Sequence, residues 1–202
     1  MLSFEHVSHQ FGARVLFQDL SLSLPESRIV LTGANGMGKT TLLLIAAGVL
    51  PPCAGRVRFN QQPVTNPAMR RKIGISANKV SLPGFFSVTE LLTFQARQFN
   101  CSADSEWIDC FGLSPFLNTR VDDLSLGNNK KLSLILALMY QPELLLLDEP
   151  TNGLDSKTRQ ALDDFFADYP GQIVIASHEP EVFAGAREVR HLHLDTNGVH
   201  DG

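Results

Sequence analysis

The sequence has little of several features that mark particular classes of protein. Its three cysteines show no metal-type spacing and provide no disulfide framework, which is typical of a reducing cytosol. Its longest apolar runs, such as residues 144–147, are far shorter than the roughly 20 residues that span a bilayer. The net charge of -4 gives no overall attraction to nucleic acid, and no secretory signal leads the chain. We therefore expect no nucleic-acid partner and no membrane span.

Hydrophobic residues make up 44% of the chain and charged residues 19%, the balance of a folded globular protein. Alternating and continuous apolar runs predict strands at residues 2–7, 15–17, 20–24, 29–32, 55–59, 144–148, 172–177, 188–194 and 199. Helical spacing predicts one helix that ends near Gly48 and further helices over residues 88–99, 104–111, 125–140, 156–167 and 179–184. The pattern indicates one α/β domain over residues 1–202, with a mostly parallel sheet and short N-terminal strands. A helical subdomain is expected as an insertion over about residues 79–141.

One glycine-rich segment carries the strongest chemical signal. Residues 33–40 read Gly-Ala-Asn-Gly-Met-Gly-Lys-Thr and fit the phosphate-binding pattern G-x-x-x-x-G-K-[ST] at every fixed position. An apolar strand precedes the segment and a helix follows it, which is the context that the pattern needs. We expect Lys39 to contact the β- and γ-phosphates of ATP and the Thr40 hydroxyl to bind Mg²⁺. The expected nucleotide ligands of this segment are Gly33, Asn35, Gly36, Gly38, Lys39, Thr40 and Thr41.

Two carboxylates follow the apolar run of residues 144–147. Asp148 ends this expected strand, where a carboxylate is suited to the Mg²⁺ ion bound by Thr40. Glu149 comes next and is suited to orient or deprotonate a water that attacks the γ-phosphate. The alternative is a solvated Asp-Glu turn, and the glycine-rich segment argues against it.

Three further segments are ambiguous when each is taken alone. Ser125 lies at a helix start, where it either caps the helix or binds phosphate. Asp155 or Ser156 caps the next helix, and His178 follows an apolar strand. Taken with the glycine-rich segment and the carboxylates, these motifs resemble the ATP-binding-cassette (ABC) ATPase family in kind and order. The family signature Leu-Ser-Gly-Gly-Gln is matched at Leu124, Ser125 and Gly127.

The resemblance implies a P-loop NTPase fold, with an antiparallel N-terminal β subdomain, that hydrolyses ATP with Mg²⁺. It implies that His178 contacts the γ-phosphate and joins Lys39 and Glu149 as a catalytic residue. Ser125 and Gly127 then complete the nucleotide site of another subunit, and Asp155 belongs to the loop that links the two sites. Further expected nucleotide ligands are Phe11, Asn78, Ser125, Gly127 and Asp155.

The chain departs from the family pattern at two of its motifs. Asn78 stands where the family has a glutamine, and we expect it as a further ligand of Mg²⁺. Its side chain is shorter by one methylene, and a bridging water can restore the contact with the metal or the attacking water. Leu126 replaces the first glycine of the signature, which costs backbone freedom if a positive φ is needed there. Phe11 matches the aromatic residue that stacks on adenine, with a core phenylalanine as the alternative. We expect an active ATPase, slowed by these departures.

By resemblance, the chain is the nucleotide-binding subunit of a transporter whose transmembrane permease is a separate polypeptide, with exporter-like character. The implied working unit is a dimer with a second copy or a homologous ATPase subunit, peripheral on the cytoplasmic face of the cell membrane. The apolar stretch of residues 81–87 lies where the family docks its membrane subunit, with internal packing as the alternative. A second functional hypothesis is a soluble ABC ATPase of a non-transport assembly, for example iron–sulfur assembly. A third is a sensor that binds nucleotide without hydrolysis, against which the intact Glu149 argues.

Overall fold

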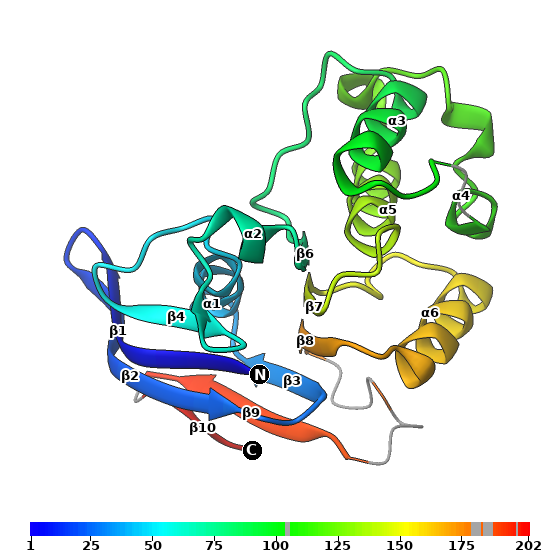
Figure 1. Cartoon of the computed structure of the whole chain (residues 1–202). Helices are drawn as coiled ribbons and strands as arrows, with labels where there is room; N and C mark the ends of the chain where they lie inside the picture. The colour runs from blue at the N-terminus through cyan, green and yellow to red at the C-terminus, as the bar shows by residue number, and fades with distance from the viewer. Residues whose placement is uncertain (104–105, 179–182, 184–187, 197) are drawn as a thin grey trace.

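Two β-sheets lie on either side of helix α1 (Lys39–Ala46), and a group of helices packs on the other face of the second sheet, as the computed structural model shows (Figure 1). The structure describes residues 1–103, 106–178, 183, 188–196 and 198–202. The four-stranded sheet has the order β2-β1-β4-β5 and is antiparallel. Its strands are β1 (Leu2–Phe11), β2 (Arg14–Leu24), β4 (Ala54–Phe59) and β5 (Gln62–Pro63).

The second sheet has the order β10-β9-β3-β8-β7-β6 and is parallel except for β10 at its edge. Its strands are β3 (Arg28–Gly33), β6 (Ile73–Ser76), β7 (Leu144–Asp148), β8 (Gln172–Ala176), β9 (Arg190–Asp195) and β10 (Gly198–Asp201). The remaining helices are α2 (Pro67–Arg70), α3 (Val88–Phe99), α4 (Glu106–Cys110), α5 (Leu126–Leu138) and α6 (Ser156–Asp168), with 3₁₀ turns at Ser114–Phe116 and Val121–Asp123. The expected α/β architecture, with an antiparallel N-terminal part and a mostly parallel sheet, is confirmed.

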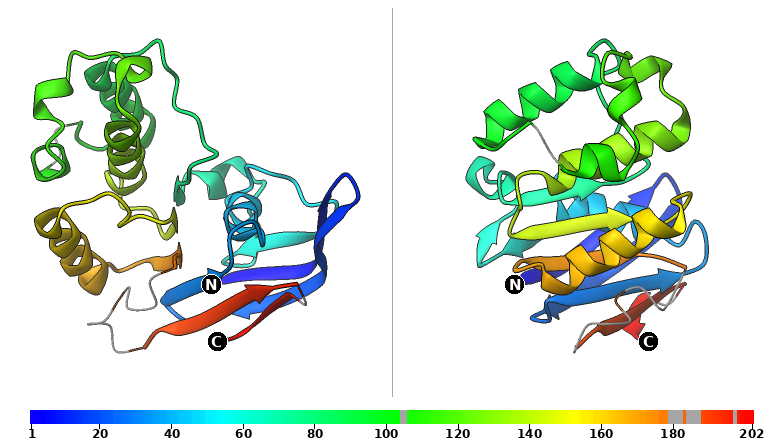
Figure 2. Two further views of the ribbon diagram at one scale, coloured as in Figure 1. Left: turned by 180° about the vertical axis from the view of Figure 1, so that it is seen from behind. Right: turned by 90° about the vertical axis from the view of Figure 1, so that its right-hand side faces the viewer.

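The leucine run of β7 explains how the core is divided. Leu144 and Leu146 pack toward α1 and the antiparallel sheet, whereas Leu145 and Leu147 pack toward the helices on the other face. All five residues of β7 are buried, because a central parallel strand is covered on both faces. The continuous apolar run therefore places Asp148 at the carboxyl end of a strand held rigidly from both sides. Figure 2 shows α6 and the α3–α5 group on the side of the sheet away from α1.

The structure differs from the sequence-based expectation at several element bounds. Residues 15–17 and 20–24 belong to one long strand, β2, because pairing with β1 continues along it through bulges. The expected helix over residues 104–111 is described only as α4, since residues 104–105 lie outside the described residues. Of the expected helix over residues 179–184, only Phe183 is described, and it is in a turn.

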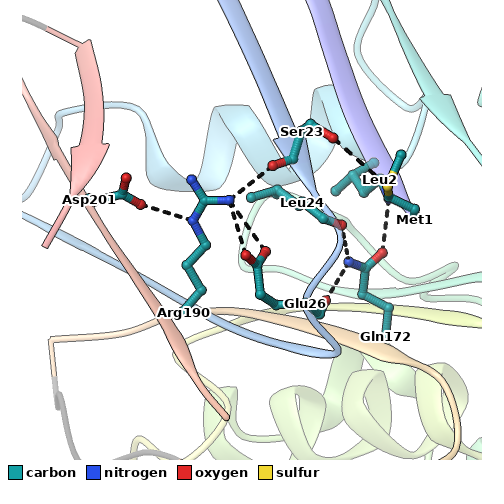
Figure 3. A network of polar contacts seen from close by, with 8 residues as sticks. All are labelled: Met1, Leu2, Ser23, Leu24, Glu26, Gln172, Arg190 and Asp201. Atoms are coloured by element: carbon teal, nitrogen blue, oxygen red, sulfur yellow. Dashed lines mark hydrogen bonds and ion pairs between the residues drawn. The ribbon is translucent and has the colours of Figure 1, made fainter.

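A polar network joins the two sheets at the end opposite the glycine-rich segment (Figure 3). The Gln172 side chain donates to the carbonyls of Leu24 and Glu26, each at 2.7 Å, and accepts from the Leu2 N–H at 3.0 Å. The Arg190 guanidinium contacts the carboxylates of Glu26 and Asp201. These contacts fix the turn between β2 and β3, and so the position at which β3 enters the core.

Candidate functional site: a phosphate-loop cavity

The glycine-rich segment forms the loop between β3 and α1. Gly33 has a φ of 143°, and a Cβ atom there would lie 2.3 Å from the Leu194 carbonyl oxygen. Gly38 has a φ of 111° and directly precedes the first residue of α1. Only glycine fits both positions, and the resulting loop brings its backbone close to the N-terminal end of α1. Such a loop is suited to anionic oxygens, because the N–H groups at a helix start lack partners within the helix.

The Lys39 side chain is buried and hydrogen-bonded to carbonyl groups of this loop. Its Nζ atom donates to the Gly33 carbonyl at 2.6 Å, and only 6% of the residue is exposed. Burial lowers the pKa of Lys39, and the neighbouring carboxylates of Glu149 and Asp148 oppose this shift. A buried ammonium group bonded only to carbonyl oxygens is electrostatically suited to receive a phosphate anion.

Thr40 and Asp148 meet across the loop. The Thr40 hydroxyl donates to Asp148 Oδ2 at 2.7 Å, and the Asp148 residue is buried. A hydroxyl and a carboxylate are hard oxygen ligands, and Mg²⁺ in nucleotide sites is typically held by one or two such groups together with phosphates and waters. These two residues therefore fit a magnesium ion.

Glu149 presents a buried carboxylate oxygen to the same space. Its φ is 50°, a left-handed conformation that costs energy for a residue with a side chain, and its N–H donates to the Ala176 carbonyl at 2.8 Å. Among the described residues, no group donates a hydrogen bond to Glu149 Oε1. His178 Nε2 lies 3.3 Å from that oxygen and 2.8 Å from Asn35 Oδ1. The three side chains converge from β7, β8 and the loop.

The loop opens into a cavity of about 400 Å³. Eleven of the expected site residues line it: Phe11, Asn35, Gly36, Gly38, Lys39, Thr40, Thr41, Asn78, Asp148, Glu149 and His178. Gly33 reaches the site through its carbonyl group. Phe11 is 48% exposed, so the alternative of a core phenylalanine is wrong.

Sequence reasoning missed three lining residues, Arg14, Leu16 and Lys79. The Arg14 guanidinium donates to the Gly36 carbonyl at 2.7 Å, and Lys79 Nζ lies 5.7 Å from the centre of the Phe11 ring. Both cations come from segments outside the phosphate-binding pattern. The sequence does contain a signal for these two cations, because each lies close to an expected ligand: Arg14 follows Phe11 by three residues, and Lys79 directly follows Asn78.

Ser125, Gly127 and Asp155 do not line the cavity. Ser125 is exposed and caps α5, where its Oγ atom accepts from the Asn128 N–H at 3.2 Å. Gly127 is exposed in the first turn of α5, and a Cβ atom there would meet nothing within 4 Å. Asp155 caps α6 by accepting from the Thr158 N–H at 2.9 Å. All three residues are exposed, and none of them is among the residues that line the cavity.

The fold and the cavity together define a nucleotide-binding protein of the P-loop NTPase class. The sequence model of the ABC transporter family matches residues 17–152. The chain belongs to the ABC transporter family, as an ATP-binding subunit with ATPase activity. No described helix combines the length and apolar character that crossing a membrane requires.

Curated relatives and solved structures agree with this assignment. A putative ABC transporter ATP-binding protein of Archaeoglobus fulgidus is 34% identical over 195 residues, which cover 90% of this chain and 79% of the relative. The cytochrome c biogenesis ATP-binding export protein CcmA of Novosphingobium aromaticivorans is 36% identical, with 84% of each chain covered. The dimeric structure of MJ0796, a bacterial ABC transporter cassette, superposes with a TM-score of 0.77 at 22% identity, covering 96% of this chain and 94% of that one. The last likeness concerns the fold alone.

Proposed function

We propose that the chain hydrolyses ATP in a two-chain sandwich and thereby drives a separate membrane subunit. The observation that carries this proposal is the separation of two sets of motif residues. Lys39, Thr40 and Glu149 line the cavity, whereas Ser125 and Gly127 are exposed and do not line it. A second chain that presents its Ser125 surface to this cavity would close the site over the nucleotide.

The cavity residues have distinct tasks in this proposal. Lys39 binds the β- and γ-phosphates, and Phe11 stacks on the adenine base. Glu149 Oε1, to which no described residue donates a hydrogen bond, accepts a proton from the attacking water, which Asn78 helps to position. His178 contacts the γ-phosphate from beside Glu149. When bound by Thr40 and Asp148, Mg²⁺ supplies charge neutralisation for the phosphates.

The partner chain supplies the remaining contacts. Ser125 and the N–H groups at the start of α5 bind the γ-phosphate of the facing site. Asp155, at the start of α6, links the two sites across the interface. Leu126 is 92% exposed between Ser125 and Gly127, and an apolar residue on this surface is suited to burial against the facing chain. ATP contacts made only in the closed dimer shift the population toward closure, and loss of the products opens it.

A Glu149→Gln variant tests the sandwich. We expect its turnover to fall at least about 100-fold, since it loses the proton acceptor. With ATP and Mg²⁺ it should elute at twice the 22.2 kDa mass of one chain, because the closed state no longer decays through hydrolysis. Adding Leu126→Glu should abolish this dimer, whereas adding Val49→Glu, at a 57% exposed apolar residue elsewhere, should not. A Glu149→Gln protein that stays monomeric with saturating ATP, alone and with its membrane partner, contradicts the proposal.

The membrane subunit is proposed to dock on exposed aromatic side chains of the helical part. Phe85 is 72% exposed and Phe94 48%, and both rings contact Phe86, at 4.5 and 5.9 Å between ring centroids. In this proposal residues 79–141 are the helical subdomain of one domain over residues 1–202. The chain as a whole is peripheral on the cytoplasmic face of the membrane. Exporter character is supported by two relatives that are named for export. One is CcmA, and the other is the Nod factor export ATP-binding protein I of Rhizobium johnstonii. The latter is 34% identical to this chain over 165 residues.

A further inference from the structure

Cys53 and His9 form a thiol–imidazole pair outside the phosphate-loop cavity. Cys53 is exposed and directly precedes β4, where its N–H donates to the Ser8 carbonyl at 2.8 Å. Its Sγ atom lies 3.8 Å from His9 Nδ1, within hydrogen-bond range for sulfur. The proposed chemistry of ATP hydrolysis uses neither residue.

The His9 imidazole depends on this thiol for its polar contact. His9 is only 5% exposed, and no described residue bonds to its buried Nε2 atom. A buried ring nitrogen without a partner costs free energy, so the remaining hydrogen bond at Nδ1 has a large share in fixing the ring. A change at the Cys53 sulfur therefore acts directly on the position of a buried ring.

The His9 ring in turn contacts the nucleotide cavity. It meets Phe11 edge to face, with 4.8 Å between ring centroids and an interplanar angle of 83°. Phe11 lines the cavity and lies under the Lys79 ammonium group. Two side-chain contacts thus connect an exposed thiol with the proposed adenine platform.

We propose that Cys53 is a modification site for small-molecule disulfides, and that its modification changes the affinity of the cavity for ATP through the Phe11 side chain. The Cys53 sulfur attacks one sulfur of a disulfide RS–SR, and the bond between the two sulfurs of the reagent breaks. His9 takes the thiol proton and passes it to the leaving thiolate. The products are a Cys53 mixed disulfide and one RSH, so that atoms and electrons balance.

The modification changes what His9 can contact. In the tautomer in which Nδ1 accepts, as this proton transfer requires, the mixed-disulfide sulfur has no proton to donate and Nδ1 loses its hydrogen bond, while no described residue bonds to Nε2. The ring must shift toward another partner, and its edge contact with Phe11 weakens. The other two cysteines are poorer nucleophiles, since burial raises the pKa of both Cys101 and Cys110. This contrast favours reaction at the exposed thiol beside the imidazole.

The rate of modification is the first test. With oxidised glutathione, and with the modified peptides detected by mass after digestion, we expect Cys53 of the full chain to react at least about tenfold faster than Cys101 or Cys110. His9→Leu should slow Cys53 and leave the other two rates unchanged. Equal rates at the three thiols, or a Cys53 rate unaffected by His9→Leu, overturn the proposal.

The affinity for ATP is the second test, and it rests on the proposed stacking of adenine on Phe11. In a Cys101→Ala/Cys110→Ala protein, the ATP affinity of the unmodified form is measured first, so that failure of the nucleotide site itself is recognised separately. Glutathionylation of Cys53 should then weaken ATP binding at least about fivefold, and dithiothreitol should restore it. In Phe11→Leu, Cys53 should still react fast, but its modification should no longer weaken ATP binding. This variant also tests the proposal if His9→Leu does not fold. An ATP affinity unchanged by complete modification overturns the proposal.

Discussion

The Asp148 carboxylate accepts a hydrogen bond and is also proposed to bind Mg²⁺. Measurements with and without the metal separate these two roles. Its Oδ2 accepts the Thr40 hydroxyl hydrogen bond in the structure and is the proposed ligand of Mg²⁺. Asp148→Asn keeps the size of the side chain but removes its charge. We expect the gain in ATP affinity that Mg²⁺ confers to fall at least about tenfold, while the affinity in excess chelator changes little. Calorimetric titrations with Mg²⁺ and with chelator measure both quantities.

A matched control is Asp19→Asn, the same isosteric change at a carboxylate that contacts only exposed groups such as His6. It should leave both affinities unchanged. An equal loss of affinity in the two titrations of Asp148→Asn would show that the carboxylate orders the loop rather than binding the metal.

Motif residues of the cavity were predictable from sequence because the motif and the fold impose the same geometry. The pattern of residues 33–40 demands a strand–loop–helix, and the apolar run before Asp148 demands a buried parallel neighbour. Arg14 and Lys79 were missed because they reach the cavity through the β1–β2 hairpin and the segment after β6, outside the motif, although each lies close in sequence to an expected ligand. The exposure of Ser125 likewise depends on where the helical part stands, which no local pattern encodes.

The Arg28 side chain shows how an element end is held in place. Arg28 begins β3, is 5% exposed, and donates to the carbonyls of Phe166, Tyr169 and Gly171 at 2.5–2.9 Å. These carbonyls belong to the end of α6 and the turn into β8. The guanidinium thus joins three elements that meet at the base of the sheet, and Arg28 lies directly before the strand that the sequence predicts at residues 29–32.

Arg28→Met should destabilise the fold by about 3 kcal/mol, because it leaves several buried carbonyl groups without a donor. The midpoint of thermal unfolding should fall by about 6–12 °C. Arg28→Lys should also be destabilising, since an ammonium group lacks the planar fork that serves several carbonyls. Arg70→Met is the matched control: its exposed guanidinium donates to a single carbonyl, that of Gly48, and its loss should cost under about 1 kcal/mol. Thermal and denaturant unfolding without nucleotide measure all three, and an Arg28→Met protein as stable as Arg70→Met would contradict the assignment.

The bounds of elements followed from sequence where burial is continuous and failed where pairing decides. Helix α3 was predicted at its observed bounds, because its apolar spacing and the Ser87–Glu90 capping box agree. Strand β2 was split in two, since its polar residues interrupt the apolar alternation while pairing with β1 carries the strand through them. Bulges in this pairing allow the long strand to bend around the core.

At the scale of the whole molecule, two of the exposed apolar surfaces among the described residues are the proposed contacts with other subunits. Leu126 marks the surface proposed to meet a second cassette, and Phe85 and Phe94 mark the one proposed to meet the membrane subunit. Both belong to the helical part: Leu126 begins α5, Phe85 lies in the segment that leads into α3, and Phe94 lies in α3 itself. A shift of that part on nucleotide binding would therefore move both surfaces together, which is the coupling that a transport ATPase needs.

Phe85→Glu tests the second surface alone. The side chain is 72% exposed, so the variant should fold and bind ATP normally, but a charge at an aromatic anchor should break docking. In membranes from cells that naturally make this chain, we expect the bound fraction to fall at least about tenfold, as loss of an anchor worth about 2 kcal/mol implies. Val49→Glu is the control and should remain bound, and detergent extracts of the wild-type complex should retain an integral membrane polypeptide with the chain. Equal membrane binding by both variants, or recovery of the wild-type chain with soluble proteins alone, would instead favour a soluble assembly.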